Sequence, residues 1–509
     1  MRLEKLTEQT VQHLHLSKIC CYGCSTSYFL EFEAMFHLMN AVQCIIDDGK
    51  RRQGEYVWNE RGIPVIGLTE FVQSDFFSNS VIIIMDDYFQ EIFERISESI
   101  SDDRVVYYFT NHETDIEEDY RLRYLNTPLQ NSILFRSGPH AEAYVKGMDF
   151  SDNARALFEY LLANGYNSRY KLIWLVKNPD DYTNYANIPN VEFLSFNWSI
   201  SESRQERDSY YQALCLAKYI FFTDAYGFAR NCRKDQIRVQ LWHGCGFKTR
   251  VNFVRCEKRY EYTTVISELY AEIHQEIYGL RENQMLVTGY AKEDWLFSPV
   301  IDFIDALSLP RAKKYIFWLP TFRMAKKELD TLDEYELESQ TGLPVVDTVD
   351  KLQILDKLLQ EKKIVLVIKL HPFQNRSGIE VVSDTNIVLL DNDELFEKDI
   401  EINRLLGCAD ALISDYSSAA VDYMILDRPI AFTLDDVDKY ESSRGFIFEN
   451  IRDWLPGKQI DTFEDFCEFV NEISDGKDLA CTIRQKLKRK MHKYGDDKNC
   501  ERIINALKL

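Results

Sequence analysis

The sequence predicts an α/β protein of several domains, each built around a parallel sheet. Short apolar runs of strand length alternate with amphipathic segments along the chain, a pattern typical of α/β architecture. The chain has 509 residues, which is too long for one hydrophobic core, so roughly two to four domains are expected. Polar residues also follow the ends of several apolar runs, and this is where ligands bind in such folds.

The first expected domain covers residues 1–125. Residues 17–23 and 42–49 are expected strands, and residues 63–71 and 80–87 complete a βαβ series. A strand, a glycine turn, a helix and a second strand that ends in Asp are typical of nucleotide-binding Rossmann units. Only Gly23 stands where the phosphate-binding fingerprint needs three glycines. The segment therefore predicts a small Rossmann-like accessory domain with no catalysis of its own.

Two further domains are expected at residues 126–305 and 306–509. Strands are predicted in the first of them at 133–137, 171–177, 191–196, 218–224 and 238–244, and in the second at 315–321, 364–372, 386–390, 409–415 and 429–433. Consecutive doubly wound domains leave a cleft between them, and ligands bind at the carboxyl ends of their strands. A functional site is therefore expected where these strands end.

The composition limits the function classes. The formal net charge of −22 argues against nucleic-acid binding, which needs a basic face, and against broad adhesion to an anionic membrane. The N-terminus lacks the apolar region of a signal peptide, and no stretch reaches the length of a membrane-spanning helix. The 12 cysteines are scattered, which suits reduced thiols. We therefore expect a cytoplasmic protein, with no metal site and no tightly bound cofactor.

Residues 410–444 carry the most informative pattern. An apolar run at 411–413 predicts a buried strand, and residues 419–426 predict a helix with one apolar face. Ser417 and Ser418 stand between them. Free backbone N–H groups and the helix dipole favour a phosphate at such a helix start. An ordinary serine N-cap would give the same pattern without any ligand, so this segment alone leaves both interpretations open.

Three other strand ends offer groups for phosphate chemistry. His243 follows an apolar run, and its imidazole suits proton transfer near neutral pH, while Lys248 adds positive charge nearby. His371 sits on a turn that Pro372 fixes, and Arg323 can hold a phosphate by two parallel hydrogen bonds. A structural histidine or a surface salt bridge is the alternative for each residue alone. Together they fit transfer chemistry on an activated phosphate ester, which needs positioning, charge neutralisation and a base.

A set of motifs in a fixed order extends over about residues 130–505: SDNARALFEYLL, LWHGCGFK, VTGYAKEDWLF, FWLPTFR, KLHPF, ISDYSSAAVDYMILDRPIAF and YESSRGFIF. With these motifs the chain resembles the CDP-glycerol glycerophosphotransferases, the teichoic-acid primase and polymerase family that includes ribitol-phosphate and capsule-polymer transferases. The resemblance implies a GT-B fold, in which two Rossmann-like domains face a cleft. The order of the motifs is specific to the family, whereas no single motif is.

The resemblance also implies an activity. Glycerol phosphate or ribitol phosphate would pass from a CDP-activated donor to a hydroxyl of a cell-surface glycopolymer, with release of CMP. His243 would act as the general base, and His371 would contact the donor pyrophosphate. The remaining implied site residues are Arg323, Asp415, Ser417, Ser418 and Arg444 on the donor side, and Lys248 and Asp152 on the acceptor side.

The implied partners are the CDP-alditol donor and a polymer or glycan-lipid acceptor, with at most peripheral association at the inner face of the cell membrane. The choice between glycerol and ribitol depends on one or two hydroxyl contacts, and the sequence leaves it open. It also leaves open a divalent-metal requirement and assembly into a homo-oligomer. Two other functions remain as alternatives: a GT-B glycosyltransferase that uses a nucleotide sugar, and a non-catalytic module of a surface-polymer complex.

Three segments depart from the family pattern. Cys245 and Gly246 replace Thr-Pro after the His-Gly pair, and residues 291–294 (AKED) replace a proline followed by Arg-Asn-Asp. Residues 496–497 are Asp-Asp where Asp-Gly is usual. The first two changes are expected near the acceptor side, so they put the identity of the acceptor in question.

Overall fold

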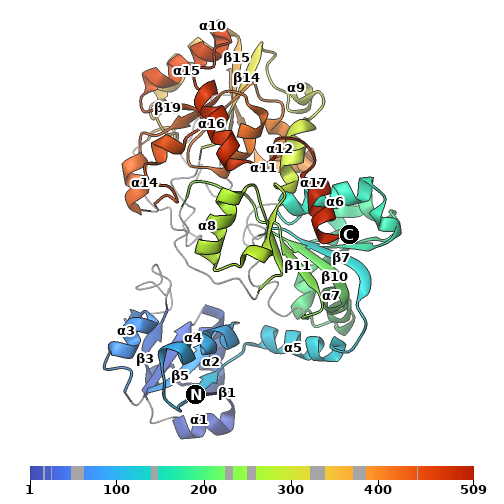
Figure 1. Ribbon diagram of the computed structural model, residues 1–509, viewed down its shortest axis with the longest axis vertical. Coiled ribbons are helices and arrows are strands. Elements are labelled where there is room, and N and C mark those ends of the chain that lie inside the picture. Colours follow the sequence, from blue (N-terminus) through green and yellow to red (C-terminus); the bar gives the residue numbers. More distant parts are fainter. Residues whose placement is uncertain are drawn as a thin grey trace.

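The computed structural model describes residues 1–14, 18–23, 26–47, 62–78, 80–86, 88–138, 147–223, 233–248, 259–320, 339–370, 386–443 and 445–509. Three units follow one another along the long axis of the molecule, each built on one sheet (Figure 1). Neighbouring strands pair in parallel in the described part of all three sheets. The predicted α/β class is therefore confirmed.

The first sheet has the strand order β1-β6-β5-β2-β3-β4. Counted from β2, this is the 3-2-1-4-5 order of a Rossmann unit, with β1 added at one edge. Its strands are β1 (Arg2–Lys5), β2 (Lys18–Gly23), β3 (Val42–Ile46), β4 (Val65–Ile66), β5 (Ser80–Met85) and β6 (Val105–Tyr108), and its helices are α1 (Glu8–Leu14), α2 (Thr26–Phe36), α3 (Leu68–Gln73) and α4 (Phe89–Ser99). Gly23 has φ +74°, a conformation that glycine adopts at little cost.

The segment at residues 63–71 differs from the expected strand. Only Val65 and Ile66 are strand, and α3 begins directly after Gly67. Leu68 and Phe71 are both buried and lie three residues apart, which is the spacing of neighbours on one helix face. Packing of these two side chains therefore explains why the chain turns into a helix so early.

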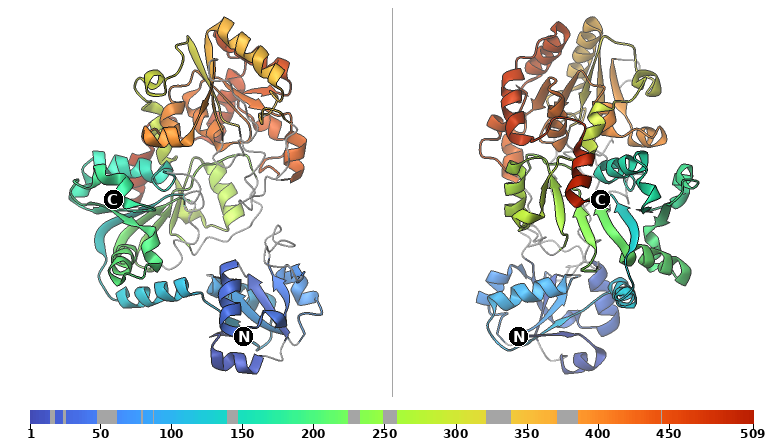
Figure 2. Two further views of the ribbon diagram at one scale, coloured as in Figure 1. Left: turned by 180° about the vertical axis from the view of Figure 1, so that it is seen from behind. Right: turned by 45° about the vertical axis from the view of Figure 1, so that its right-hand side comes forward.

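Helix α5 (His112–Tyr124) joins the first unit to the second (Figure 2). The hydroxyl of Tyr120 on α5 donates to Asp208 Oδ1 at 2.7 Å, and its ring stacks on Tyr211 with centroids 4.3 Å apart. A second contact comes from Arg259 of the second unit. Its guanidinium lies 3.5 Å from the ring centroid of Tyr88, at the start of α4 in the first unit.

The second sheet has the order β13-β12-β11-β10-β7-β8-β9. Its strands are β7 (Gln130–Arg136), β8 (Lys171–Val176), β9 (Val191–Ser195), β10 (Ala217–Phe222), β11 (Ile237–Gln240), β12 (Tyr262–Val265) and β13 (Met285–Val287), and its helices are α6 (Asp152–Ala163), α7 (Arg204–Leu216), α8 (Glu268–Tyr278) and α9 (Phe303–Ala306). All five predicted strands are confirmed. The strand before His243 is shorter than expected, because β11 ends at Gln240.

The third sheet has the order β16-β15-β14-β17-β18-β19, so the strand order reverses between β14 and β17. Its strands are β14 (Lys314–Trp318), β15 (Ile364–Lys369), β16 (Ile387–Leu390), β17 (Ala411–Ser414), β18 (Ile430–Thr433) and β19 (Lys458–Ile460). The helices are α10 (Val349–Lys362), α11 (Asn392–Glu397), α12 (Ile402–Leu406), α13 (Ser418–Tyr423), α14 (Val437–Ser443), α15 (Phe463–Asp475), α16 (Cys481–Met491) and α17 (Asn499–Leu507). All five predicted strands are again confirmed.

Helix α17 returns from the third unit to the second and lies beside α6 (Figure 1). Asp294 caps it, because the two carboxylate oxygens accept the backbone N–H groups of Asn499 and Cys500, each at 2.9 Å. The side chain of Asn499 in turn donates to the carbonyl of Tyr290 at 3.1 Å. The chain's last helix therefore fastens the second unit to the third.

An ionic cluster joins the same two units beside α6. The Arg155 guanidinium contacts Glu159 at 2.9 Å, Asp399 at 2.5 Å and Glu401 at 3.3 Å. Burial raises the pKa of Glu401 to about 7, although Arg155 opposes the rise. Asp152 and Glu159 are the other charged groups that raise it.

Replacement of Glu401 by glutamine is expected to stabilise the protein at high pH only. Because the pKa of Glu401 is raised in the folded state, its contribution to stability is complete below about pH 4.3, the unfolded value, and is lost as pH rises through 7. Glutamine resembles the neutral acid. The free energy of unfolding of the variant, relative to that of the wild type, is therefore expected to rise by up to roughly 3 kcal/mol between pH 5 and pH 8. Urea unfolding at both pH values measures this gap.

Glu397→Gln is the matched control, because Glu397 is an exposed carboxylate at the end of nearby α11. Its stability difference from the wild type is expected to stay constant between pH 5 and pH 8. A stability advantage of Glu401→Gln over the wild type that becomes smaller as pH rises would contradict the raised pKa of Glu401.

Candidate functional site

The loop after β11 presents His243 at the carboxyl end of the second sheet. Two residues that flank it have unusual backbone conformations: φ is +60° at Trp242 and +146° at Gly244. The first is uncommon for a bulky residue. The side chain of Asn153 on α6 holds this loop by donating to the carbonyls of Leu241 at 3.2 Å and Trp242 at 2.9 Å. The His243 ring stacks against Trp242 with centroids 5.1 Å apart.

Ser417 and Ser418 lie at the carboxyl end of the third sheet. Strand β17 ends at Ser414, Ser417 is the N-cap of α13, and its side chain accepts the N–H of Ala419 at 3.3 Å. The N-cap interpretation is therefore confirmed, and it does not exclude a phosphate at the same helix start. The helix also starts beside the β14/β17 reversal of strand order, where ligands bind in open α/β sheets.

The segment after β11 in the second sheet and the segment after β17 in the third sheet lie against each other. A Cβ atom placed on Gly244 would lie 2.7 Å from Ser418 Oγ, and one on Gly246 would lie 3.5 Å from the backbone nitrogen of Ser418. Further along the same segment, Lys248 forms an isolated antiparallel bridge with Phe446, and Phe247 O accepts the N–H of Ile447 at 2.9 Å. Residues 243–248 of the second unit therefore lie directly against the start of α13 and residues 446–447 of the third.

The other predicted residues take different positions. Asp152 begins α6, with its carboxylate 3.3 Å from Lys292 Nζ. The Lys248 ammonium lies 5.8 Å from the ring centroid of Tyr440, and Asp415 is fully buried directly after β17. The structure thus brings His243, Ser417, Ser418, Lys248 and Asp152 to one junction between two units. His371, Arg323 and Arg444 lie outside the described residues.

Sequence reasoning missed Lys292 as a site residue. Its Nζ donates to the carbonyl oxygen of His243 at 2.5 Å and lies 3.4 Å from Asp422 Oδ2 on α13. The signal for it in the sequence is the AKED segment, where the chain departs from the family pattern.

Two of the departures from the family pattern, Cys245 and most of residues 291–294, are buried in the structure. Cys245 is 2% exposed, and its Sγ lies 2.9 Å from the hydroxyl of Tyr290. Burial raises the pKa of the Cys245 thiol, so the neutral form is favoured. Ala291, Lys292 and Glu293 are also buried. These residues pack beside the His243 loop, and their link to the identity of the acceptor stays a prediction.

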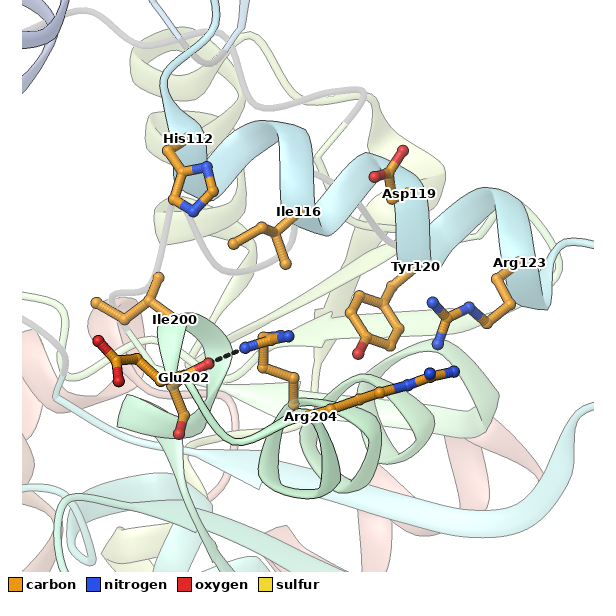
Figure 3. A pocket seen from close by; sticks show the side chains of 10 residues that line it. His112, Ile116, Asp119, Tyr120, Arg123, Ile200, Glu202 and Arg204 are labelled. Carbon is orange, nitrogen blue, oxygen red and sulfur yellow. Dashed lines mark hydrogen bonds between the residues drawn. The ribbon is translucent and has the colours of Figure 1, made fainter.

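A cavity of about 350 Å³ lies elsewhere, between α5 and α7 (Figure 3). Three arginines line it, but each already has a partner: Arg123 pairs with Asp208 at 2.9 Å, Arg204 approaches Asp208 at 3.6 Å, and Arg207 donates to the carbonyl of Ser201. None of the predicted site residues lines it. We therefore place the functional site at the strand ends rather than in this cavity.

No group of three or more His, Cys, Asp or Glu side chains is arranged to hold a metal ion within the described ranges. In the same part of the chain, no helix combines the length and the apolar character needed to cross a bilayer.

The fold and the motif order define a class of protein. The family model described as CDP-Glycerol:Poly(glycerophosphate) glycerophosphotransferase matches residues 120–509. The chain belongs to this family, as its motifs predict.

Relatives of known name agree with the family. The teichoic acid ribitol-phosphate polymerase TarK of Staphylococcus aureus is 25% identical over 335 residues, covering 61% of each chain. The teichoic acid glycerol-phosphate primase of Bacillus subtilis is 29% identical over 395 residues, covering 71% of this chain and 90% of the primase. The chain spans between 42% and 61% of the length of three teichoic acid polymerases that it matches.

Solved structures support the fold. A structure of the wall teichoic acid polymerase TagF superposes with a TM-score of 0.59 at 21% identity, covering 83% of this chain and 97% of that one. A variant of TagF was also solved after a soak with CDPG. At this level of identity the likeness concerns the fold alone, and it confirms the predicted GT-B arrangement.

Proposed function

We propose that the chain transfers glycerol phosphate or ribitol phosphate from a CDP-activated donor to a hydroxyl of a cell-surface glycopolymer, with release of CMP. The contact between Gly244, next to His243, and Ser418 at the start of α13 carries the proposal, in a chain of this family. It brings a candidate base and a candidate phosphate-binding helix start together. Phosphoryl transfer needs this positioning of groups more than covalent chemistry from the protein.

The proposed reaction has one transfer step. His243 takes the proton of the acceptor hydroxyl while its oxygen forms a bond to the phosphorus that carries the alditol, and the bond from that phosphorus to CMP breaks. The N–H groups and hydroxyls of Ser417 and Ser418 hold the donor phosphates at the positive end of α13. Proposed further contacts are His371, Arg323, Asp415 and Arg444 to the donor, and Lys248 and Asp152 to the acceptor.

The family match and the named relatives support a CDP-linked donor and a teichoic-acid-like or capsule-like acceptor. The TagF soak with CDPG points the same way. We also propose that the chain works in the cytoplasm, at most peripherally at the inner face of the membrane, and divides at residues 125/126 and 305/306. The first unit then serves as an accessory domain.

A donor panel tests the proposal. CDP-glycerol, CDP-ribitol and several UDP-sugars are compared by thermal shift, because a ligand at 100 times its Kd stabilises the fold by about 2.7 kcal/mol. CMP release is then measured with glycopolymer acceptors. We expect a shift and CMP release with at least one CDP-alditol. A shift with UDP-sugars alone would favour a glycosyltransferase, and binding without turnover on any acceptor would favour a non-catalytic module.

A further inference from the structure

We infer that Lys292 is a positioning residue for His243 and ties the base to the donor side of the site. The inference rests on the proposed function, in which His243 is the base. It concerns a side chain that is buried behind the loop and that the transfer step itself does not use.

The ammonium group of Lys292 meets three segments at once. Its Nζ donates to the carbonyl of His243 at 2.5 Å, and it lies 3.3 Å from Asp152 Oδ1 on α6 and 3.4 Å from Asp422 Oδ2 on α13. The side chain is only 10% exposed. Lysine is rarely buried to this extent unless it is paired, so the position of Lys292 depends on both carboxylates.

The loop that Lys292 holds is strained. The positive φ at Trp242 is a conformation that a bulky residue keeps only where the surroundings hold it. Three consecutive carbonyls are held from one side: Asn153 Nδ2 donates to Leu241 O and Trp242 O, and Lys292 donates to His243 O. Asn153 Oδ1 also accepts the backbone N–H of Lys292 at 3.0 Å. Asn153 and Lys292 together therefore form a clamp that fixes the direction of the His243 side chain.

The charge on Lys292 strengthens the clamp. Burial alone would lower the pKa of Lys292, but the carboxylates of Asp152 and Asp422 raise it above the ordinary range. The group is therefore protonated at neutral pH, and hydrogen bonds from a charged donor are about twice as strong as neutral ones. A neutral side chain of similar length cannot replace this bond.

Asp422 connects the clamp to the serines. Ser418 and Asp422 are four residues apart on α13, so they lie on one helix face. A Cβ atom on Gly244 would be 2.7 Å from Ser418 Oγ and 3.8 Å from Lys292 Nζ. A shift of α13 on donor binding would therefore reach the carbonyl of His243 through Asp422 and Lys292.

Kinetics of Lys292→Met provide the first test. We expect kcat for CMP release to fall by about 100-fold, because a misplacement of about 1 Å has this effect, while the donor KM changes little. Lys292→Arg keeps the charge and the donors, and is expected to recover most of the activity. Lys314→Met is the control, since Lys314 Nζ donates to the carbonyl of Ile473 at 2.6 Å in the third unit without reaching His243.

A second test needs no turnover. In histidine-labelled protein, the His243 imidazole resonance is assigned by its loss in His243→Gln. We expect it to move in Lys292→Met and in the milder variant Asp422→Asn, which serves if Lys292→Met does not fold, and to stay in Lys314→Met. An unmoved resonance with unchanged kcat would overturn the inference, as would a raised donor KM at unchanged kcat. Absence of CMP release from the wild type would instead overturn the proposed function, and the resonance would still test the clamp.

Discussion

His243→Gln is expected to lower kcat for CMP release by about 10³-fold, within the range of 10²–10⁴ that general acid–base catalysis contributes. Glutamine keeps a polar side chain of moderate length but cannot take up a proton from the acceptor hydroxyl. Because Asn153 and Lys292 hold the backbone of this loop, we expect the loop to keep its conformation. The measurement is single-turnover CMP release at saturating donor and acceptor, which separates chemistry from product release.

Donor binding distinguishes loss of the base from loss of the site. The thermal shift produced by the CDP-alditol is expected to be the same for His243→Gln and the wild type, because the proposed donor contacts do not include His243. His112→Gln is the matched control, since His112 is exposed at the start of α5. Full activity in His243→Gln would show that another group is the base. Loss of the donor-induced shift would place His243 on the donor instead.

The longest and most apolar strands are those that the sequence predicts most directly. The confirmed strands β8 and β15 are six residues long and nearly all apolar, a strong pattern on its own. The missed strands have three or four residues each: β1 (RLEK), β6 (VVYY), β12 (YTTV), β13 (MLV) and β19 (KQI). Segments this short become strands because they pair with a neighbouring strand. That pairing is a tertiary contact, so the local sequence does not predict it.

In the candidate site, too, some residues could be predicted from a local pattern and others could not. His243 and Ser418 were predicted because each follows an apolar strand, which is a local pattern. The clamp was not, because Lys292 meets partners that lie far away in sequence, at Asp152 and Asp422. The positive φ at Trp242 also has no local signature, since it results from hydrogen bonds to the loop carbonyls. Tertiary contacts, rather than the local sequence pattern, therefore determine how the side chains of His243 and Ser418 are oriented.

Gly244→Ala is expected to reduce both stability and activity, because glycine is required at this position for two reasons. Its φ of +146° is a conformation that residues with a Cβ rarely adopt, at a cost of about 1–3 kcal/mol. The new methyl group would also lie 2.7 Å from Ser418 Oγ and 2.9 Å from Ser418 Cβ. Either the His243 loop or the start of α13 must then move. A displacement of about 1 Å would lower kcat by about 100-fold, and urea unfolding together with CMP release measures both effects.

Gly246→Ala separates the general effect of an added methyl group from the specific contact. A Cβ atom on Gly246 would lie 3.5 Å from the nearest atoms of Ser418, an ordinary van der Waals separation, so we expect nearly wild-type stability and activity. Ser418→Gly removes the side chain that the methyl group of Gly244→Ala meets. The double variant Gly244→Ala/Ser418→Gly should therefore regain the stability lost to the clash but not the part lost to backbone strain. Equal losses in Gly244→Ala and Gly246→Ala would show that the two strand ends are not held in contact, and the proposed junction of base and phosphate groups would then lose its structural basis.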